Sequence, residues 1–283
     1  MEALRALGAL VEPPGEATTP LARAVRIKAR LPDPSDYTDL FVFQLYPYAS
    51  VYLGAEGMLG GEARGRVAGF WSALGLTPPA EPDHLTALLG LYAALAEDGS
   101  RQALHARKAL LWEHLLSWLP YYLERVEEVG IGFYADWARL LRAVLLSEAK
   151  QLGPPAVLPL HLREAPALAH PDEEGGEAFL GSLLAPVRTG MILVRSDLVR
   201  CARELGLGLR VGERSYVLRA LFSQAPDELL QWLADHARAS ANRHRAMPAT
   251  LRAVSGFWAE RADSAAALLT DVRTAARKKA YAG

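Results

Sequence analysis

"EPDHLTALLGLYAALAEDG", residues 81–99, carries the clearest helical pattern of the sequence. Its leucines and its tyrosine recur every three or four positions, which is the spacing of one face of an α-helix. Pro82 suits the first helical position, where the N–H group that proline lacks would be unpaired anyway. The Asp-Gly pair at the end of the stretch is a typical helix stop. The sequence therefore predicts a helix from Pro82 to about Glu97.

The same helical period continues through most of the chain, and strand-like alternation is nearly absent. Further helices are expected at 35–45, 60–74, 101–118, 121–129, 133–152, 196–205, 212–223, 226–245 and 248–279. In the helix expected at 101–118, an inner stripe is predicted from Leu104, Leu111, Leu115 and Trp118. The fold class predicted from this pattern is all-α.

A change in composition divides the chain. Residues 153–177 carry five prolines and no steady period, which is typical of a long, partly mobile connector. The expected parts are an N-terminal segment at 1–34, a helical bundle at 35–152, a proline-rich connector at 153–179 and a C-terminal helical extension at 180–283. Ser196 and Asp197 are expected to cap a helix of the extension. Because apolar stripes such as the one containing Leu198 and Cys201 must be buried, we expect the extension to pack on the bundle.

Bulk properties exclude several classes of protein. The chain has 283 residues, 51% of them hydrophobic, and a formal net charge of −1, which argues against a general nucleic-acid binder. Cys201 is the only cysteine, so an intramolecular disulfide is impossible. The first twenty residues lack the apolar core of a secretory signal, and no apolar run reaches the length of a membrane span. We therefore expect a cytoplasmic protein without membrane insertion.

Motifs for cofactor or metal chemistry are absent from the sequence. There is no phosphate-binding GxxxxGK[ST] loop, no HExxH, no CxxC and no GxSxG. The glycine-rich residues 57–65 have no strand before them, so a dinucleotide site lacks its structural context. His236 and His244 are spaced to share a helix face, but a metal would need further ligands. We expect neither a cofactor nor a metal.

Asp83 and His84 raise the question of catalysis. Neighbouring side chains on a helix point about 100° apart, so these two would not bond each other easily. Asp83 near a helix start has an alternative role, which is to complement the helix dipole and accept a bond from a free N–H. Catalysis, capping and ligand contact stay open for this pair, and capping is favoured on the residues alone.

Four motifs together resemble one protein family. They are "LFVFQLYPYASVYLG" at 40–54, "EPDHLTALLGLYAAL" at 81–95, "WEHLLSWLPYYLERVE" at 112–127 and "GFYADWARLL" at 132–141. In their order and spacing, residues 35–150 resemble the TorD/DmsD/NarJ family of redox-enzyme maturation chaperones, here with a long C-terminal extension. The resemblance implies a TorD-type helical bundle with additional helices at its C-terminal side.

The resemblance also implies a function. Members are not enzymes; they bind the apo catalytic subunit of a molybdenum-containing oxidoreductase, or its twin-arginine signal peptide. They assist cofactor insertion before export or assembly, and a monomer or a homodimer is expected. The client-binding residues carried over are Tyr46, Pro47, Ser50, Tyr52, Glu81, Pro82, Asp83, His84, Tyr92, His114 and Trp118.

A helical groove would suit the apolar part of such a signal peptide, and carboxylates would suit its arginines. Glu56, Glu62, Glu81 and Asp83 are candidates for the rim. A second acidic cluster, for which a solvated face is the favoured interpretation, consists of Glu124, Glu127 and Glu128. Trp112, Leu115 and Trp118 could be core or groove residues, and Tyr46, Tyr48 and Tyr52 are expected in a loop.

Two other hypotheses remain open. One is a generic helical adaptor that binds an amphipathic partner helix. The other is an enzyme that uses Asp83, His84 and His114, although no nucleophile or metal set accompanies them. For the shared-groove hypothesis, we expect the loops at 46–60 and 76–84 to lie close together.

Overall fold

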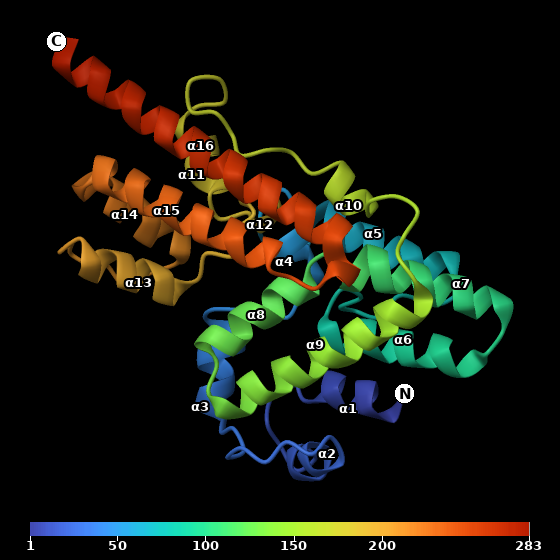
Figure 1. Ribbon diagram of the computed structural model, residues 1–283. Helices are drawn as coiled ribbons and strands as arrows, with labels where there is room; N and C mark the ends of the chain where they lie inside the picture. The colour runs from blue at the N-terminus through green and yellow to red at the C-terminus, as the bar shows by residue number, and fades with distance from the viewer. Residues whose placement is uncertain (283) are drawn as a thin grey trace. The chain divides into compact units, whose positions relative to one another are not determined.

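The computed structural model describes residues 1–282, with side chains described up to residue 278. Helices and loops make up this part of the chain, which confirms the predicted all-α class (Figure 1). The exception is one isolated antiparallel bridge between Tyr48 and His84. Within the described residues, the helices that form are too short or too polar to cross a lipid bilayer.

The chain forms two compact units, which are described separately. Unit 1 contains residues 1–54 and 58–163, and unit 2 contains residues 55–57 and the chain from residue 164 onward. The helices of unit 1 are α1 (Glu2–Ala9), α2 (Thr18–Ala24), α3 (Pro34–Tyr37), η1 (Thr38–Val42), α4 (Ala49–Leu53), α5 (Gly61–Ala73), α6 (Leu85–Asp98), α7 (Arg101–Ala109), η2 (Leu110–Leu115), α8 (Leu119–Val129), α9 (Gly132–Leu152) and α10 (Leu160–Arg163). Of these, η1 and η2 are π-helical turns.

Helix α6 lies in the core of unit 1 and buries the predicted apolar face. It begins at Leu85, three residues later than the sequence suggested, because residues 83–85 pair with the segment before α4. Gly99 ends it with a φ of +68°, a left-handed conformation that glycine adopts without a steric penalty. The predicted helix is thus confirmed, with a corrected start.

Helix α1 lies within the N-terminal segment 1–34, which was expected outside the bundle, and it packs against α6. The approach is close at Gly8, where an added Cβ would lie 3.2 Å from the Cβ of Leu89. The Thr86 hydroxyl donates to the Gly8 carbonyl at 2.9 Å, and the Trp137 indole N–H donates to the Leu7 carbonyl at 2.8 Å. These contacts make α1 part of unit 1.

The helix expected at 101–118 is divided. Its first part, α7, is charged and buries little, so Leu104 is exposed and its predicted place on the inner stripe is wrong. The π-helical η2 follows and buries a run of large side chains. Trp118 then precedes α8, which carries Pro120 in its first turn. A proline there starts a new helix without losing a hydrogen bond.

Unit 2 has a core of its own. Its helices are α11 (Gly176–Ser182), α12 (Pro186–Thr189), α13 (Arg195–Glu204), α14 (Arg214–Gln224), α15 (Pro226–Arg245), η3 (Ala249–Leu251) and α16 (Arg252–Ala282). Helices α15 and α16 run side by side (Figure 1). Leu198, Cys201 and Leu269 are among the residues of the core. Packing of the extension on the bundle stays a prediction.

The start of α13 differs from the expected cap. Val194, not Ser196, is the N-cap residue, and the Asp197 carboxylate accepts the Val194 N–H at 3.0 Å. Asp197 thus fixes the start of the helix from within its first turn, as the acidic member of a capping box does.

Candidate functional site

Two loops of unit 1 meet at the residues that the sequence singled out. The Ala49 N–H donates to the Asp83 carbonyl at 3.0 Å, and the Leu85 N–H donates to the Pro47 carbonyl at 2.8 Å. The isolated bridge between Tyr48 and His84 lies between these bonds. The expectation that the loops at 46–60 and 76–84 lie close together is confirmed.

Asp83 holds this junction. Its carboxylate accepts the Ser50 N–H at 3.1 Å, and only 1% of the residue is exposed. Ser50 lies in the first turn of α4, so Asp83 caps that helix from 33 residues away rather than capping α6. The Ser50 hydroxyl in turn accepts the Gly60 N–H at 3.2 Å. Asp83 is therefore placed as a structural clamp below the surface, not at an exposed rim.

His84 caps α6. Its Nδ1 accepts the Thr86 N–H at 3.3 Å, and burial lowers the pKa of the imidazole below its usual value. A neutral ring is thus favoured at pH 7. Asp83 and His84 direct their side chains to different partners, so the geometry does not support a catalytic dyad. Their arrangement fits a structural role at the starts of α4 and α6 rather than catalysis.

Side chains around His84 form a row that reaches the surface. The Glu12 carboxylate lies 3.6 Å from His84 Nδ1. The Tyr48 ring meets the same imidazole edge-on, with the ring centroids 4.7 Å apart. The Tyr48 hydroxyl then donates to Glu81 at 2.8 Å. We call Glu12, His84, Tyr48 and Glu81 the acidic row.

The acidic row ends in two accessible carboxylates. Glu81 is exposed, and the Glu12 side chain is half exposed. Burial, followed by the bond to Glu81, raises the pKa of Tyr48. Burial and then the charges of Glu12 and Glu81 raise the pKa of Tyr37, so this ring also lies near both acids. Glu12 and Tyr37 were missed, because both lie outside the motifs used for the prediction.

Other predicted client-binding residues are buried. Trp118 is fully buried; its ring stacks on Tyr52 at 5.0 Å, and its indole N–H donates to the His114 carbonyl at 2.9 Å. Tyr52 belongs to α4 rather than to a loop, and its hydroxyl donates to the Tyr46 carbonyl. Tyr46 itself is partly exposed. For Trp118 the structure favours the core alternative.

Tyr92 is also buried and ties three helices together. Its hydroxyl donates to Glu148 of α9 at 2.6 Å and accepts a bond from Arg107 of α7 at 3.0 Å. Arg107 and Glu148 form an ion pair. This cluster satisfies a buried carboxylate with a cation and a hydroxyl, so a role in holding the bundle is the direct interpretation.

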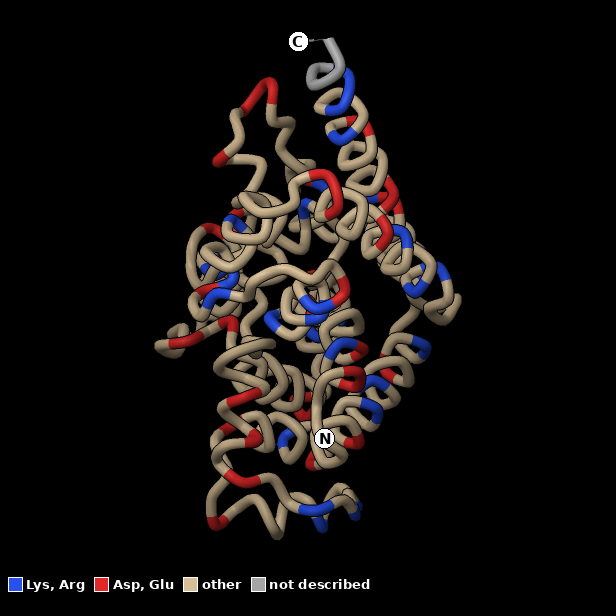
Figure 2. Tube along the Cα trace, turned by 90° about the vertical axis from the view of Figure 1, so that its left-hand side faces the viewer, with Lys and Arg blue, Asp and Glu red and all other residues tan. Residues whose placement is uncertain are grey.

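The candidate rim acids have different surroundings. Glu62 pairs with Arg66 within α5, and Glu56 belongs to unit 2. Glu127 pairs with Arg142 at 2.7 Å. Glu128 pairs with Arg125, so the cluster at 124–128 is largely neutralised by arginines. Acidic and basic residues are interspersed along the trace (Figure 2). Of the candidate rim acids, Glu81 is the one that lies exposed at the loop junction.

An apolar surface adjoins this junction. The Trp71 indole of α5 donates to the Pro82 carbonyl at 3.4 Å, and both Trp71 and the preceding Phe70 are partly exposed. The Leu76 N–H donates to the Trp71 carbonyl, and its side chain is 44% exposed. Phe70 in turn contacts the His114 ring, with centroids 4.9 Å apart. We call Phe70, Trp71 and Leu76 the apolar strip.

His114 itself lies below the surface. It is 6% exposed, and its Nδ1 lies 3.4 Å from Nε2 of His161. Burial and the neighbouring His161 lower the pKa of His114 to about 3. A neutral His114 is thus strongly favoured. Within the described residues, no three His, Cys, Asp or Glu side chains are grouped so that they could hold a metal ion.

Comparisons with known proteins match the region that carries the site. The family described as "Nitrate reductase delta subunit" matches residues 9–124. "Chaperone protein TorD" of Vibrio vulnificus (strain YJ016) is 30% identical over 146 residues, which cover 45% of this chain and 67% of that relative. "Chaperone protein TorD" of Vibrio cholerae serotype O1 (strain M66-2) is 33% identical over 137 residues, which cover 42% of this chain and 62% of that relative.

Proposed function

The chain belongs to the TorD/DmsD/NarJ family of redox-enzyme maturation chaperones, and on that premise we propose that it binds a twin-arginine signal peptide. The peptide would belong to the apo catalytic subunit of a molybdenum-containing oxidoreductase. The chaperone would hold this client in the cytoplasm until its cofactor is inserted. This proposal combines the family with the chemistry of the site.

The acidic row is the observation that carries the proposal. Glu12 and Glu81 are two carboxylates connected by a chain of contacts through the His84 and Tyr48 rings. Guanidinium groups pair with carboxylates and stack on aromatic faces. Two adjacent arginines of a client would each find one carboxylate, with a ring beside it. The row is thus suited to a pair of cations rather than to one.

The apolar strip suits the segment that follows the arginines. Trp71 is fixed beside Pro82, so the strip begins next to the acidic row. Phe70 and Leu76 extend it along α5 and the following loop. Burying such side chains stabilises a complex by about 25 cal/mol per Å² of apolar surface. Specificity would come from the row and much of the affinity from the strip.

Calorimetric titration tests the proposal. The probe is a synthetic peptide with two adjacent arginines followed by a Leu/Ala-rich stretch. Glu81→Gln and Glu12→Gln each remove a charge and keep the shape, and Glu16→Gln is the control at another exposed glutamate. Each acid variant should lose about 0.5–1 kcal/mol of binding free energy, which corresponds to a two- to fivefold rise in Kd. The loss is small because the acids are accessible to solvent. The loss should shrink at high salt.

The controls separate this function from its rival. A peptide in which both arginines are replaced by glutamine should bind more weakly than the parent peptide. Equal binding of both peptides would support a generic adaptor for amphipathic helices instead. If Glu12→Gln and Glu81→Gln bind the parent peptide as tightly as Glu16→Gln does at low salt, the acidic row does not read arginines.

A further inference from the structure

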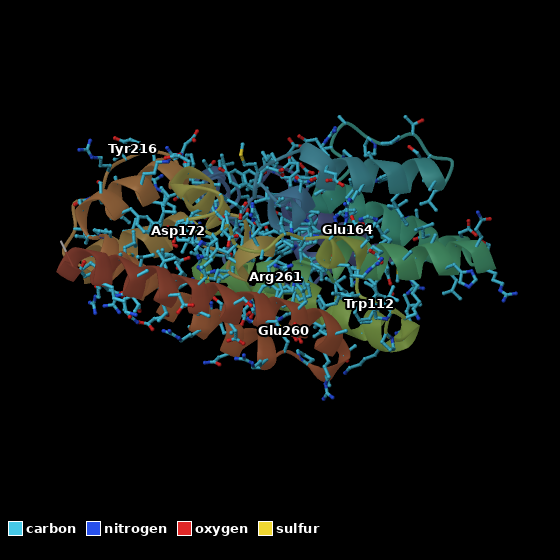
Figure 3. All side chains as sticks on the ribbon, turned by 90° about the horizontal axis from the view of Figure 1, so that it is seen from above. Trp112, Glu164, Asp172, Tyr216, Glu260 and Arg261 are labelled. Atoms are coloured by element: carbon cyan, nitrogen blue, oxygen red, sulfur yellow. The ribbon has the colours of Figure 1, made fainter. Side chains whose placement is uncertain are left out.

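The segment between α9 and the end of α10, residues 153–163, is held by consecutive residues of the π-helical η2. We call this segment the strap; its course from α9 to α10 can be followed in Figure 1. The indole N–H of Trp112, labelled in Figure 3, donates to the Gly153 carbonyl at 2.9 Å. The Leu160 N–H donates to the Glu113 carboxylate at 2.7 Å.

The third contact joins two histidines. His161 of the strap lies against His114 of η2, and both residues are buried. On another side His114 meets the ring of Phe70 in the apolar strip. His114 therefore sits where the apolar strip and the strap meet, and His161 helps to shield it from solvent.

The strap has few backbone bonds of its own. Three of the seven residues at 153–159 are prolines, which have no N–H to donate. Its short helix α10 is closed by bonds from the Leu162 and Arg163 N–H groups to the Pro159 carbonyl, both at 3.0 Å. Opening the strap would break these single hydrogen bonds and expose His161 and Leu162, but it would leave the hydrogen bonds within helices α1–α9 intact.

The strap carries an apolar run of its own. Residues 157–163 read VLPLHLR, in which the arginine follows the apolar residues, whereas the arginines of the proposed client precede theirs. Leu162 is buried, whereas Val157 is 61% exposed. Because the strap holds His161 against His114, which contacts Phe70 of the apolar strip, an apolar client segment that reached His114 would have to displace it.

We propose that the strap is an internal competitor of the client: it covers His114, the neighbour of Phe70 in the apolar strip, and it lifts when the client's apolar segment binds. This inference rests on the proposed function. It also explains how His114, a residue within the family's motifs, can contact a client although it is buried in the free protein. The apparent Kd then equals the intrinsic Kd divided by the fraction of molecules in which the strap is open.

Hydrogen exchange of the strap amides, read together with calorimetry, tests the inference. The probes are the parent peptide of the proposed function and a second peptide in which a Gly/Ser spacer replaces the Leu/Ala-rich stretch. The parent peptide at saturation should speed the exchange of the Leu162 and Arg163 amides. The spacer peptide should leave that exchange unchanged, because it engages the acidic row alone.

Two variants weaken the strap. His161→Ala removes the contact with His114, and Glu113→Gln keeps its shape but weakens the bond from Leu160. His105→Ala, at an exposed histidine of α7, is the matched control. Both strap variants should bind the parent peptide about two- to tenfold more tightly, because the open fraction rises. Circular dichroism confirms that each variant is folded, and Glu113→Gln keeps the test decisive if His161→Ala does not fold.

The outcomes separate the inference from the proposed function. Faster strap exchange together with tighter binding by the strap variants supports the competitor. If the parent peptide binds but the strap exchange does not rise and the strap variants bind like His105→Ala, the inference fails and the proposed function stands. If neither the native protein nor any variant binds the parent peptide, both fail.

Discussion

Replacing Trp118 with alanine should destabilise unit 1 rather than only weaken binding. The side chain is fully buried, stacks on Tyr52 with an interplanar angle of 8° and also packs against Tyr122. Deleting a buried tryptophan costs about 3–5 kcal/mol. The stacked pair accounts for about 0.5–1.5 kcal/mol of stability beyond the area that it buries.

The loss should appear as a lower melting temperature. For a unit of this size, 1 kcal/mol corresponds to about 2–4 °C, so Trp118→Ala should melt about 6–20 °C below the native protein. Thermal melts followed by far-ultraviolet circular dichroism measure the shift. Trp118→Phe keeps most of the ring volume and loses the bond to the His114 carbonyl, so it should lose only about 1–2 kcal/mol.

A control on the surface sharpens the test. Trp71 is partly exposed, and its indole hydrogen bond to the Pro82 carbonyl is long at 3.4 Å. Trp71→Ala should therefore melt close to the native protein but bind the parent peptide more weakly. The opposite pattern, in which Trp118→Ala melts within about 2 °C of the native protein yet loses peptide affinity, would refute the core assignment of Trp118.

Three further predictions concern stability. The pKa of His114 is about 3 in the folded protein and near 6.5 in the unfolded chain, so only the unfolded chain binds this proton between pH 7 and 5. The free energy of unfolding should therefore fall by about 2 kcal/mol over that range. Urea titrations at both pH values should show a smaller fall for His114→Gln. Arg107→Met leaves the buried Glu148 without its cation, so urea titration should show a free energy of unfolding that is lower by about 3–5 kcal/mol. The double variant Arg107→Met/Glu148→Met should regain much of that stability. Gly190→Ala forces a φ of +67° on alanine and places its Cβ 2.4 Å from the Ala262 nitrogen. The stability of unit 2 should therefore fall by more than the roughly 1–3 kcal/mol that backbone strain costs alone. Thermal melts should show a smaller loss for the control Gly175→Ala, whose Cβ has no neighbour within 4 Å.

Much of the fold follows from local pattern. The period of α6 and the proline at the start of α15 place those helices almost where they form, because amphipathic spacing and first-turn prolines act within a few residues. The π-helical turn at η2 was not foreseen. Its extra residue per turn is a property of packing rather than of residue type. The predicted burial of Leu104 on the same helix face as Leu111 and Leu115 was therefore wrong.

The site was predictable in part. The motifs brought the two loops together, and Glu81 was chosen correctly as an exposed acid at their junction. Asp83 was a candidate for the rim because it lies near the two loops expected to border the groove; here its buried carboxylate caps α4, a contact 33 residues away that no local pattern reveals. Glu12 was missed for the same reason, since α1 reaches His84 only through tertiary packing against α6.

A double-mutant cycle between the acidic row and the client measures whether Glu12 and Glu81 each recognise one arginine. Glu81→Gln and Glu12→Gln are each combined with peptides in which one or the other arginine is glutamine, and Kd is measured by calorimetry at low salt. We expect a coupling energy of about 0.5–1 kcal/mol for one arginine with Glu81 and for the other with Glu12. The same cycle with Glu16→Gln should give a coupling near zero. Coupling near zero for both Glu12 and Glu81 would contradict the proposed role of the acidic row, because the arginines would then bind elsewhere.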